Sequence, residues 1–434
     1  MAIVAPGSST TVSSSDTSTS YTVPLTVVTS LFFMWGFLTC LNDILVPHLK
    51  PIFDLNYTQI MLIQFAFFGA YFLFSIPSAK VIDWIGYQRS MVLGLLTMGL
   101  GAFLFVPAAS VPSYPLFLMA LIVLAAGITC LQVAANPYVT VLGKPETASS
   151  RLNLTQAFNS LGTFLAPFFG GLFILTAAPK TADEIRVLAP DVLQAYRLHE
   201  SATVKLPYVG LGIALVLLAI AIGSFKLPKI PQAQHKVGEH VNDSIWRHPN
   251  LIFGAIAIFV YVGAEVSIGS FLVNYFSQPE IGGLTEKVAA SFVAFYWGGA
   301  MVGRFIGSGL LQKMKTGHLL GICAICAAAL VTISMLATGH FAMWSIILVG
   351  FFNSIMFPSI FTLGVAELGP LTGDGSGIMI MAIVGGALIP LAQGAVADRI
   401  GLHHAFFLPV ICYLYILFFA LSGSKPNSER HARA

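Results

Sequence analysis

The sequence predicts an all-α integral membrane protein with twelve transmembrane helices, arranged as two six-helix halves. Of its 434 residues, 56% are apolar and only 9% are charged, which is more apolar surface than one soluble core can hide from water. Apolar runs of the roughly 20 residues that cross a ~30 Å hydrocarbon layer recur along the chain. A single polar stretch near the middle divides these runs into two equal sets.

The first set of apolar runs lies at about 24–48, 58–80, 89–108, 113–141, 151–176 and 206–227. The second set lies at about 248–276, 287–311, 317–338, 341–365, 376–397 and 404–422. Because lipid offers the backbone no hydrogen-bond partners, runs of this length must be helices, and not the shorter alternating strands of a barrel.

The domain organisation follows from these runs. We expect a Ser/Thr-rich, disordered cytoplasmic tail at 1–22, a first helical bundle at 23–227, a cytoplasmic linker at 228–247, a second bundle at 248–423 and a short cytoplasmic tail at 424–434. The tail at 1–22 contains no Lys or Arg, so it lacks the basic start of a secretory signal.

The basic residues predict the orientation in the membrane. With the N-terminus inside the cell, the cytoplasmic segments hold thirteen Lys and Arg and the outer segments hold seven. The excess of positive charge on the cytoplasmic side favours cytoplasmic N- and C-termini in a multi-pass plasma (inner) membrane protein. The long outer loop 177–205 carries four of the seven outer charges, but long loops weigh less in this rule.

Composition and motifs exclude several other classes of function. The net charge is only +3 and the basic residues are scattered, so no groove for nucleic acid is expected. The chain has no HExxH, no G-x-S-x-G and no phosphate-binding loop, so we expect neither an enzyme nor an ATP-driven pump. The five cysteines lie in apolar runs and indicate packing, not a metal site or disulfides. We expect no cofactor. We expect the protein to be a monomer.

Six helices, a polar linker and six more helices are the layout of secondary transporters, whose substrate site lies at the midplane between the halves. Fragments of repetition agree with this layout. The fourth run contains Asn136-Pro137, and the tenth contains Asn353 with Pro358 five residues later. The sequence therefore predicts a transporter with a central site.

Three charged residues lie away from the ends of the apolar runs, where an ionised group costs at least ~2.5–3.5 kcal/mol. Asp43 lies late in the first run beside Asn42 and is either a cavity-facing functional acid or a hydrated residue at the interface. Glu265 lies deep in the seventh run and is predicted to be functional. Arg304 follows a stripe of small residues, and it either neutralises an acid or bonds the end of a neighbouring helix.

Neutral amides in the fourth run suggest a polar cavity. Gln132 and Asn136 are one turn apart and share a helix face. Pro137 removes the backbone donor that would have met the carbonyl of Val133. A freed carbonyl beside two amides suits a polyol.

Other polar and aromatic residues extend this candidate site. Any single amide is equally well explained as a hydrogen bond between helices, worth ~0.6–2 kcal/mol. Their concentration in a few runs favours a shared cavity, and aromatic rings suit the apolar face of a sugar. The remaining candidate substrate contacts are Asn42, Gln156, Asn159, Asn274, Trp297 and Asn353, with Asn153 completing a three-residue spacing in the fifth run.

Longer motifs carry a resemblance to a known family. The segments 41–45 (LNDIL), 130–143 (CLQVAANPYVTVLG), 151–160 (RLNLTQAFNS) and 261–265 (YVGAE) resemble the fucose-galactose-hexose symporter family of the major facilitator superfamily. The glucose/galactose transporter branch is the most similar, and the match covers nearly all of the chain beyond residue 22. The resemblance implies the major facilitator fold and cation-coupled hexose uptake by alternating access, with H⁺ favoured and Na⁺ possible.

The resemblance also implies roles for single residues. Asp43 stands where the fucose transporter of the family has a required acid, but Gln132 stands where that transporter has a protonatable glutamate. A proton path through Gln132 is therefore not carried over, and Glu265 is the second candidate coupling acid, as in the glucose/galactose branch. Asn159 and Arg304 match polar positions of the family.

A loop signature of the superfamily is partly kept at 83–89, with Asp83 and Arg89, and we expect these two residues to take part in gating or structure together with Arg304 and Pro137. A second copy at 394–401 falls on the outer side of the predicted topology, so it is either a lookalike or a sign of an error in the helix count. The alternatives to symport are an uncoupled sugar uniporter, a carrier of fucose or N-acetylglucosamine, and a sugar receptor that does not transport.

Overall fold

The computed structural model describes residues 21–53, 57–111, 113–173, 188–203, 205–228 and 244–426, and every element in them is helical. The first part of the chain contains α1 (Thr22–Phe53), α2 (Tyr57–Ser110), α3 (Tyr114–Val141), α4 (Ala148–Phe173), α6 (Pro190–Thr203) and α7 (Lys205–Ser224). The second part contains α8 (Pro249–Ser277), α9 (Glu286–Leu310), α10 (Thr316–Leu336), α11 (Gly339–Asn353), α12 (Met356–Gly364), α13 (Thr372–Met381), α14 (Gly385–Ile400), α15 (Leu402–Ala405) and α16 (Phe407–Phe418). The long elements are helices because their apolar runs have no hydrogen-bond partners in lipid other than their own backbone.

The described helices account for twelve crossings. Ten stretches are long and apolar enough to span a membrane. One of them, Phe65–Ser110, contains a backbone break at Gly86 (φ 78°, ψ 167°), which divides α2 into two crossings. The polar helix α4 adds the twelfth. The predicted count of twelve is confirmed within the described residues.

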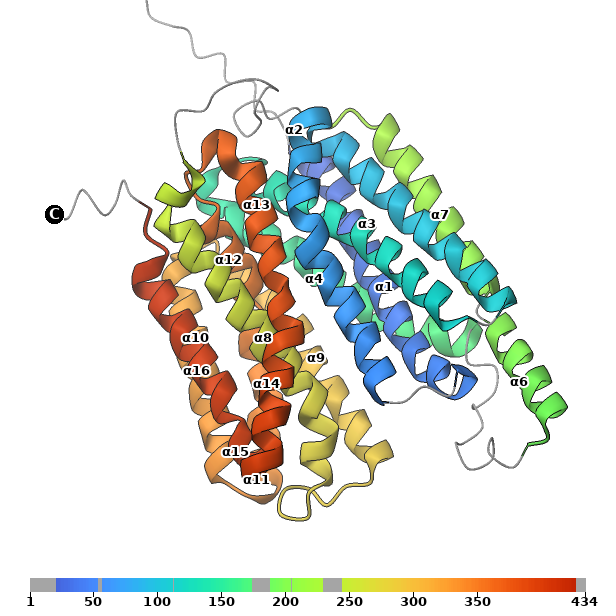
Figure 1. Cartoon of the computed structure of the whole chain (residues 1–434). Helices are drawn as coiled ribbons and strands as arrows, with labels where there is room; N and C mark the ends of the chain where they lie inside the picture. Colours follow the sequence, from blue (N-terminus) through green and yellow to red (C-terminus); the bar gives the residue numbers. More distant parts are fainter. Residues whose placement is uncertain are drawn as a thin grey trace, which may run out of the picture.

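The helices pack as two groups (Figure 1). In the first group α2 packs on α3 and α7, and α1 packs on α4. In the second group α8 packs on α14 and α16, and α9 packs on α11. The groups meet where α13 contacts α2 and α3, and where α4 contacts α9. Most of the predicted linker, residues 229–243, lies outside the described residues, as do nearly all of tail 1–22 and residues 427–434.

The two ends of the molecule are distinguished by the linker. The last turn of α7 and the first turn of α8 lie at one end, which we call the linker end (Figure 1). The break at Gly86 lies at the same end, because α2 turns back there after its first crossing. The loops that follow α8, α10 and α14 lie at the opposite end, which we call the far end. The signature copy at 394–401 is therefore a lookalike at the far end, and the predicted helix count needs no revision.

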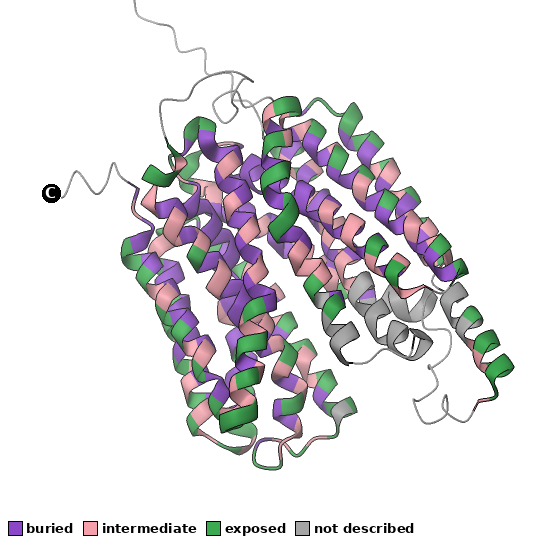
Figure 2. Ribbon diagram, viewed as in Figure 1, coloured by how far each residue is buried: buried purple, intermediate pink, exposed green. Residues whose placement is uncertain are grey.

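The outer surface is apolar, as a lipid-facing surface must be. Large exposed side chains include Leu73 (65%), Leu217 (61%) and Phe341 (68%). Buried residues lie where helices face one another, and exposed residues follow the outward faces (Figure 2). Soluble proteins rarely expose apolar side chains so widely, so the surface itself indicates a bilayer.

Candidate functional site

A polar cluster lies inside the first half. The Gln132 side chain on α3 donates a hydrogen bond to the Tyr71 hydroxyl on α2 at 2.6 Å. One turn further along α3, the Asn136 amide oxygen accepts a hydrogen bond from Gln156 Nε2 on α4 at 3.5 Å. Asn136 Nδ2 is buried and has no partner in the described part of the chain. The structure thus brings three of the predicted amides together and leaves one of their donors available.

The three regularly spaced amides of α4 contact three different helices. Asn153 Nδ2 donates to the backbone oxygen of Arg304 on α9 at 2.7 Å, Gln156 reaches α3, and Asn159 Nδ2 donates to the Phe32 oxygen on α1 at 2.9 Å. A three-residue step turns a helix by about 60° backwards, so the two steps between these residues cover about 120° of its surface. Of the three, only Gln156 therefore contacts the first cluster in the described residues.

A second polar cluster lies inside the second half and surrounds Glu265. The Tyr261 hydroxyl lies 2.8 Å from Glu265 Oε1 and 3.1 Å from the backbone oxygen of Asn353. Asn353 Nδ2 donates to the Tyr296 hydroxyl at 2.9 Å. Tyr261, Tyr296 and Asn353 are fully buried, and the equally buried Tyr413 on α16 is close enough to interact with Asn353 and Glu265. Helices α8, α9, α11 and α16 thus build one network around a single carboxylate.

Glycines bring the helices of this second cluster together. A Cβ on Gly350 of α11 would lie 2.2 Å from the backbone oxygen of Tyr296 on α9. A Cβ on Gly263 of α8 would lie 2.2 Å from the Ile389 side chain on α14. Small residues allow such close approach between membrane helices. The approach at Gly350 carries Asn353, one turn later, to the Tyr296 hydroxyl.

Arg304 joins the second cluster to the first half. Its Nε donates to the Ser354 oxygen at the end of α11 at 3.2 Å, and its Nη1 donates to the Ser160 hydroxyl on α4. Its charge also acts on Glu265. Of the two roles that the sequence left open, the structure shows the hydrogen bond to the end of a neighbouring helix and adds a partner in the other half.

The freed carbonyl of Val133 is not left for a substrate. The Ser376 hydroxyl on α13 donates to it at 2.8 Å, and both residues are fully buried. The sequence-based interpretation that this carbonyl suits a polyol is therefore corrected, because a hydroxyl from the other half already occupies it. Pro137 does lie inside α3 as expected.

The remaining predicted site residues lie further out. Trp297 is 42% exposed, contacts the Gly269 position of α8 and lies seven residues before Arg304, hence on the same face of α9. Asn274 is exposed near the end of α8, and the structure gives it no place in either cluster. The side chains of Asn42 and Asp43 lie outside the described residues, so their roles stay predictions.

The loop signature lies at the linker end. Lys80 forms ion pairs with Asp374 on α13 at 2.8 Å and with Asp83 at 3.7 Å. Gln88 Nε2 donates to the Ile222 oxygen at 2.8 Å. Arg89 is exposed beside a hollow of about 310 Å³ lined by this loop and the end of α7. Asp83 thus lies where the first half meets α13, and the structure shows no such contact for Arg89.

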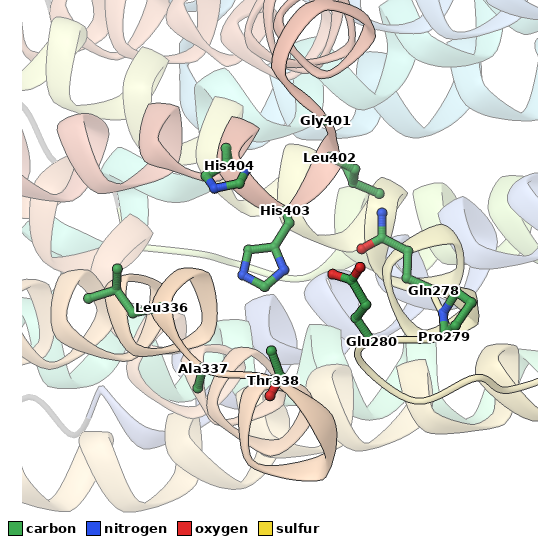
Figure 3. Close-up of a pocket in the computed structure, with 10 residues that line it drawn as sticks. All are labelled: Gln278, Pro279, Glu280, Leu336, Ala337, Thr338, Gly401, Leu402, His403 and His404. Atoms are coloured by element: carbon green, nitrogen blue, oxygen red, sulfur yellow. The ribbon is translucent and has the colours of Figure 1, made fainter.

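A hollow of about 500 Å³ at the far end lies away from both clusters. Its lining comes from the loops after α8, α10 and α14, and the Glu280 carboxylate points toward the His403 ring (Figure 3). His403 Nε2 lies 2.5 Å from the Met335 oxygen. No group of three His, Cys, Asp or Glu suited to a metal ion occurs in the described residues.

These features together define a class of protein. Two helical bundles each enclose a buried polar cluster, and the bundles are joined by hydrogen bonds at the linker end, as in membrane transporters built from two similar halves. Residues 27–383 match the Major Facilitator Superfamily. The chain belongs to this superfamily, and relatives confirm the resemblance to its fucose-galactose-hexose symporters.

Named relatives cover almost the whole chain. A glucose/galactose transporter of Brucella abortus (strain 9-941) is 54% identical over 405 residues, which are 93% of this chain and 95% of the relative. The L-fucose-proton symporter of Escherichia coli (strain K12) is 36% identical over 415 residues, 94% of each chain. A crystal structure of FucP, a major facilitator superfamily transporter, in the outward conformation is similar with a TM-score of 0.86 and 34% identity, over 93% of this chain and 99% of that one.

Proposed function

We propose that this protein is a cation-coupled symporter that carries a hexose such as glucose or galactose into the cell by alternating access. The observation that carries the proposal is the pair of buried polar clusters, one in each half. Neutral amides suited to sugar hydroxyls lie in the first half, and the partly buried carboxylate of Glu265 lies in the second. Relatives named as glucose/galactose transporters support the substrate class.

The sugar would bind between the halves. Asn136 Nδ2 supplies a free donor, and Gln132 and Gln156 supply further amide groups beside it. The exposed ring of Trp297 lies on the face of α9 that Arg304 turns toward the first half, so it is suited to cover the apolar face of a pyranose ring. Asn42, Asn159 and Asn353 remain candidate contacts.

The coupling cation would bind at Glu265 or Asp43. When no cation is bound, the carboxylate is charged and opposes the conformational change that moves the site from one side of the membrane to the other. When the cation and the sugar are bound, the site is neutral and can reorient. The Tyr261 hydroxyl holds the Glu265 carboxylate in place. H⁺ is the favoured cation because relatives are named proton symporters, and Na⁺ is the alternative.

The conformation follows from the contacts between the halves. The hydrogen bonds and ion pair described above join the halves toward the linker end, through Lys80, Val133, Asn153 and Ser160 on one side. With cytoplasmic termini in the plasma membrane, as the basic residues predict, this is an outward-facing state. The likeness to a symporter structure in the outward conformation supports this interpretation.

The proposal is tested by uptake into proteoliposomes under a pH gradient and, separately, under a Na⁺ gradient. Radiolabelled glucose, galactose, fucose and N-acetylglucosamine are compared under each. We expect accumulation of glucose or galactose above the external concentration under the pH gradient, abolished by an uncoupler. Equilibration that ignores both gradients would indicate a uniporter, and the absence of any sugar movement would contradict transport.

A further inference from the structure

Two prolines in corresponding helices each free a backbone carbonyl, and in each case a side chain from a different helix occupies it. Pro137 in α3 leaves the Val133 carbonyl without its intrahelical donor, and Pro358, in the first turn of α12, has no N–H to offer the Ser354 carbonyl at the end of α11. Ser376 of α13 donates to the first and Arg304 of α9 donates to the second. The fourth and tenth crossings thus carry matching acceptors.

Each donor belongs to one of the two seams between the halves. Ser376 crosses directly from α13 to α3. Arg304 uses one nitrogen for the Ser354 oxygen and another for the Ser160 hydroxyl of α4. The Val133 carbonyl therefore lies at the seam of α13 with α2 and α3, whereas the Ser354 carbonyl lies within the second half and holds the arginine that reaches α4.

A glycine beside each donor permits the close approach. A Cβ on Gly377, next to Ser376, would lie 2.9 Å from the Ala79 side chain on α2. A Cβ on Gly303, next to Arg304, would lie 2.6 Å from the Phe351 oxygen on α11. The seam of α13 with α2 and α3 therefore combines a glycine, a neighbouring donor and a carbonyl that a proline has freed. Gly303 instead brings α9 close to α11 within the second half, beside the Ser354 carbonyl that orients Arg304.

We propose that the Ser376–Val133 and Arg304–Ser160 contacts form a two-point latch that holds the linker end closed, and that Ser376 and Arg304 are positioning residues that set how readily this end opens. A carbonyl already bonded within its helix gains little from a new donor, whereas a freed, buried carbonyl is costly unless it is paired. Pro137 thereby makes closure of the linker end more favourable, whereas the Ser354 carbonyl lies within the second half and holds Arg304 in place for Ser160. The inference rests on alternating access in the proposed function, but not on the identity of the sugar or the cation.

The latch is tested by distances between spin labels, in protein without substrate and with Cys40, Cys130, Cys323, Cys326 and Cys412 replaced. One pair of labels, at Lys144 and Lys313, reports on the linker end. A second pair, at Val111 and Leu336, reports on the far end. All four label positions are exposed. The measurement needs no transported sugar, so its failure is separate from a failure of hexose symport.

In Ser376→Ala protein the Val133 carbonyl loses its partner, and we expect the ratio of open to closed linker ends to rise roughly tenfold. Adding Pro137→Ala supplies an intrahelical N–H to the same carbonyl and should return the ratio toward the parent value. Arg304→Lys tests the other seam independently and should shift the ratio in the same direction, because an ammonium lacks the planar fork that serves two acceptors.

Ser267→Ala is the matched control, because Ser267 is equally buried and its hydroxyl has no partner in the described residues. Unchanged distances in both Ser376→Ala and Arg304→Lys protein would overturn the latch. An equal shift in Ser267→Ala protein, or no effect of Pro137→Ala on the Ser376→Ala protein, would overturn it as well.

Discussion

The Tyr261 hydroxyl lies 2.8 Å from Glu265 Oε1, one helical turn away on α8. This contact fixes a carboxylate inside the second half, whereas the other candidate coupling acid, Asp43, belongs to α1 in the first half. The same hydroxyl lies 3.1 Å from the Asn353 oxygen, so the carboxylate, α8 and α11 share one polar group. A change in the charge of Glu265 therefore acts directly on the hydrogen bonds between α8 and α11.

Replacing Gln132 by Ala should weaken sugar binding. The change removes a predicted contact to a sugar hydroxyl and leaves the Tyr71 hydroxyl without this donor, so we expect KM for the transported hexose to rise roughly tenfold. Initial rates of uptake measure it. Ser345→Ala is the control, since its hydroxyl donates to the Phe341 oxygen of its own helix at 2.7 Å. An unchanged KM would remove Gln132 from the sugar site.

Replacing Gly350 by Ala should destabilise the second half. The added Cβ would lie 2.2 Å from the Tyr296 oxygen, and forcing helices apart in a packed core costs about 1–3 kcal/mol. The melting temperature of the purified protein in detergent should fall. Gly298→Ala on α9 should leave it nearly unchanged, because nothing lies within 4 Å of the new Cβ. Equal melting temperatures for the two variants would contradict the close packing of α11 on α9.

The ion pair between Lys80 and Asp374 should contribute little by itself. The Lys80 side chain is 51% exposed, and an exposed pair is worth ~0–1 kcal/mol. Lys80→Met should therefore lower gradient-driven uptake by less than about fivefold. Raised salt should lower gradient-driven uptake by the parent protein only slightly. Complete loss of uptake would mean that Lys80 acts beyond this pair.

The crossings and the family were predictable from the sequence because each depends on local runs of residues. Apolar runs predicted the twelve crossings, although α4 is too polar to stand among the candidate spans of the described residues. The spacing of Gln132 and Asn136 placed both on one face of α3. The proline at 137 also showed that the Val133 carbonyl would be free. Its partner Ser376, however, lies 243 residues away in sequence, and no local pattern indicates which of many polar residues will meet it.

The network around Glu265 was only partly foreseen for the same reason. Tyr261 stands four residues before Glu265, a spacing that places both on one helix face, and this signal could have indicated the contact. Tyr296 and Tyr413 come from α9 and α16, and in sequence they are indistinguishable from other aromatic packing residues. Arg304 was ambiguous because its neighbours depend on how two distant helices cross.

The most direct test of cation-coupled hexose transport compares accumulation with exchange in Glu265→Gln and Asp43→Asn proteoliposomes. Neutralising the residue that carries the cation should abolish uphill, gradient-driven accumulation of glucose or galactose while counterflow exchange of the sugar continues. We predict this separation for at least one of the two variants. If both variants still accumulate sugar against its gradient as the parent does, neither acid couples the cation and the proposed mechanism is contradicted.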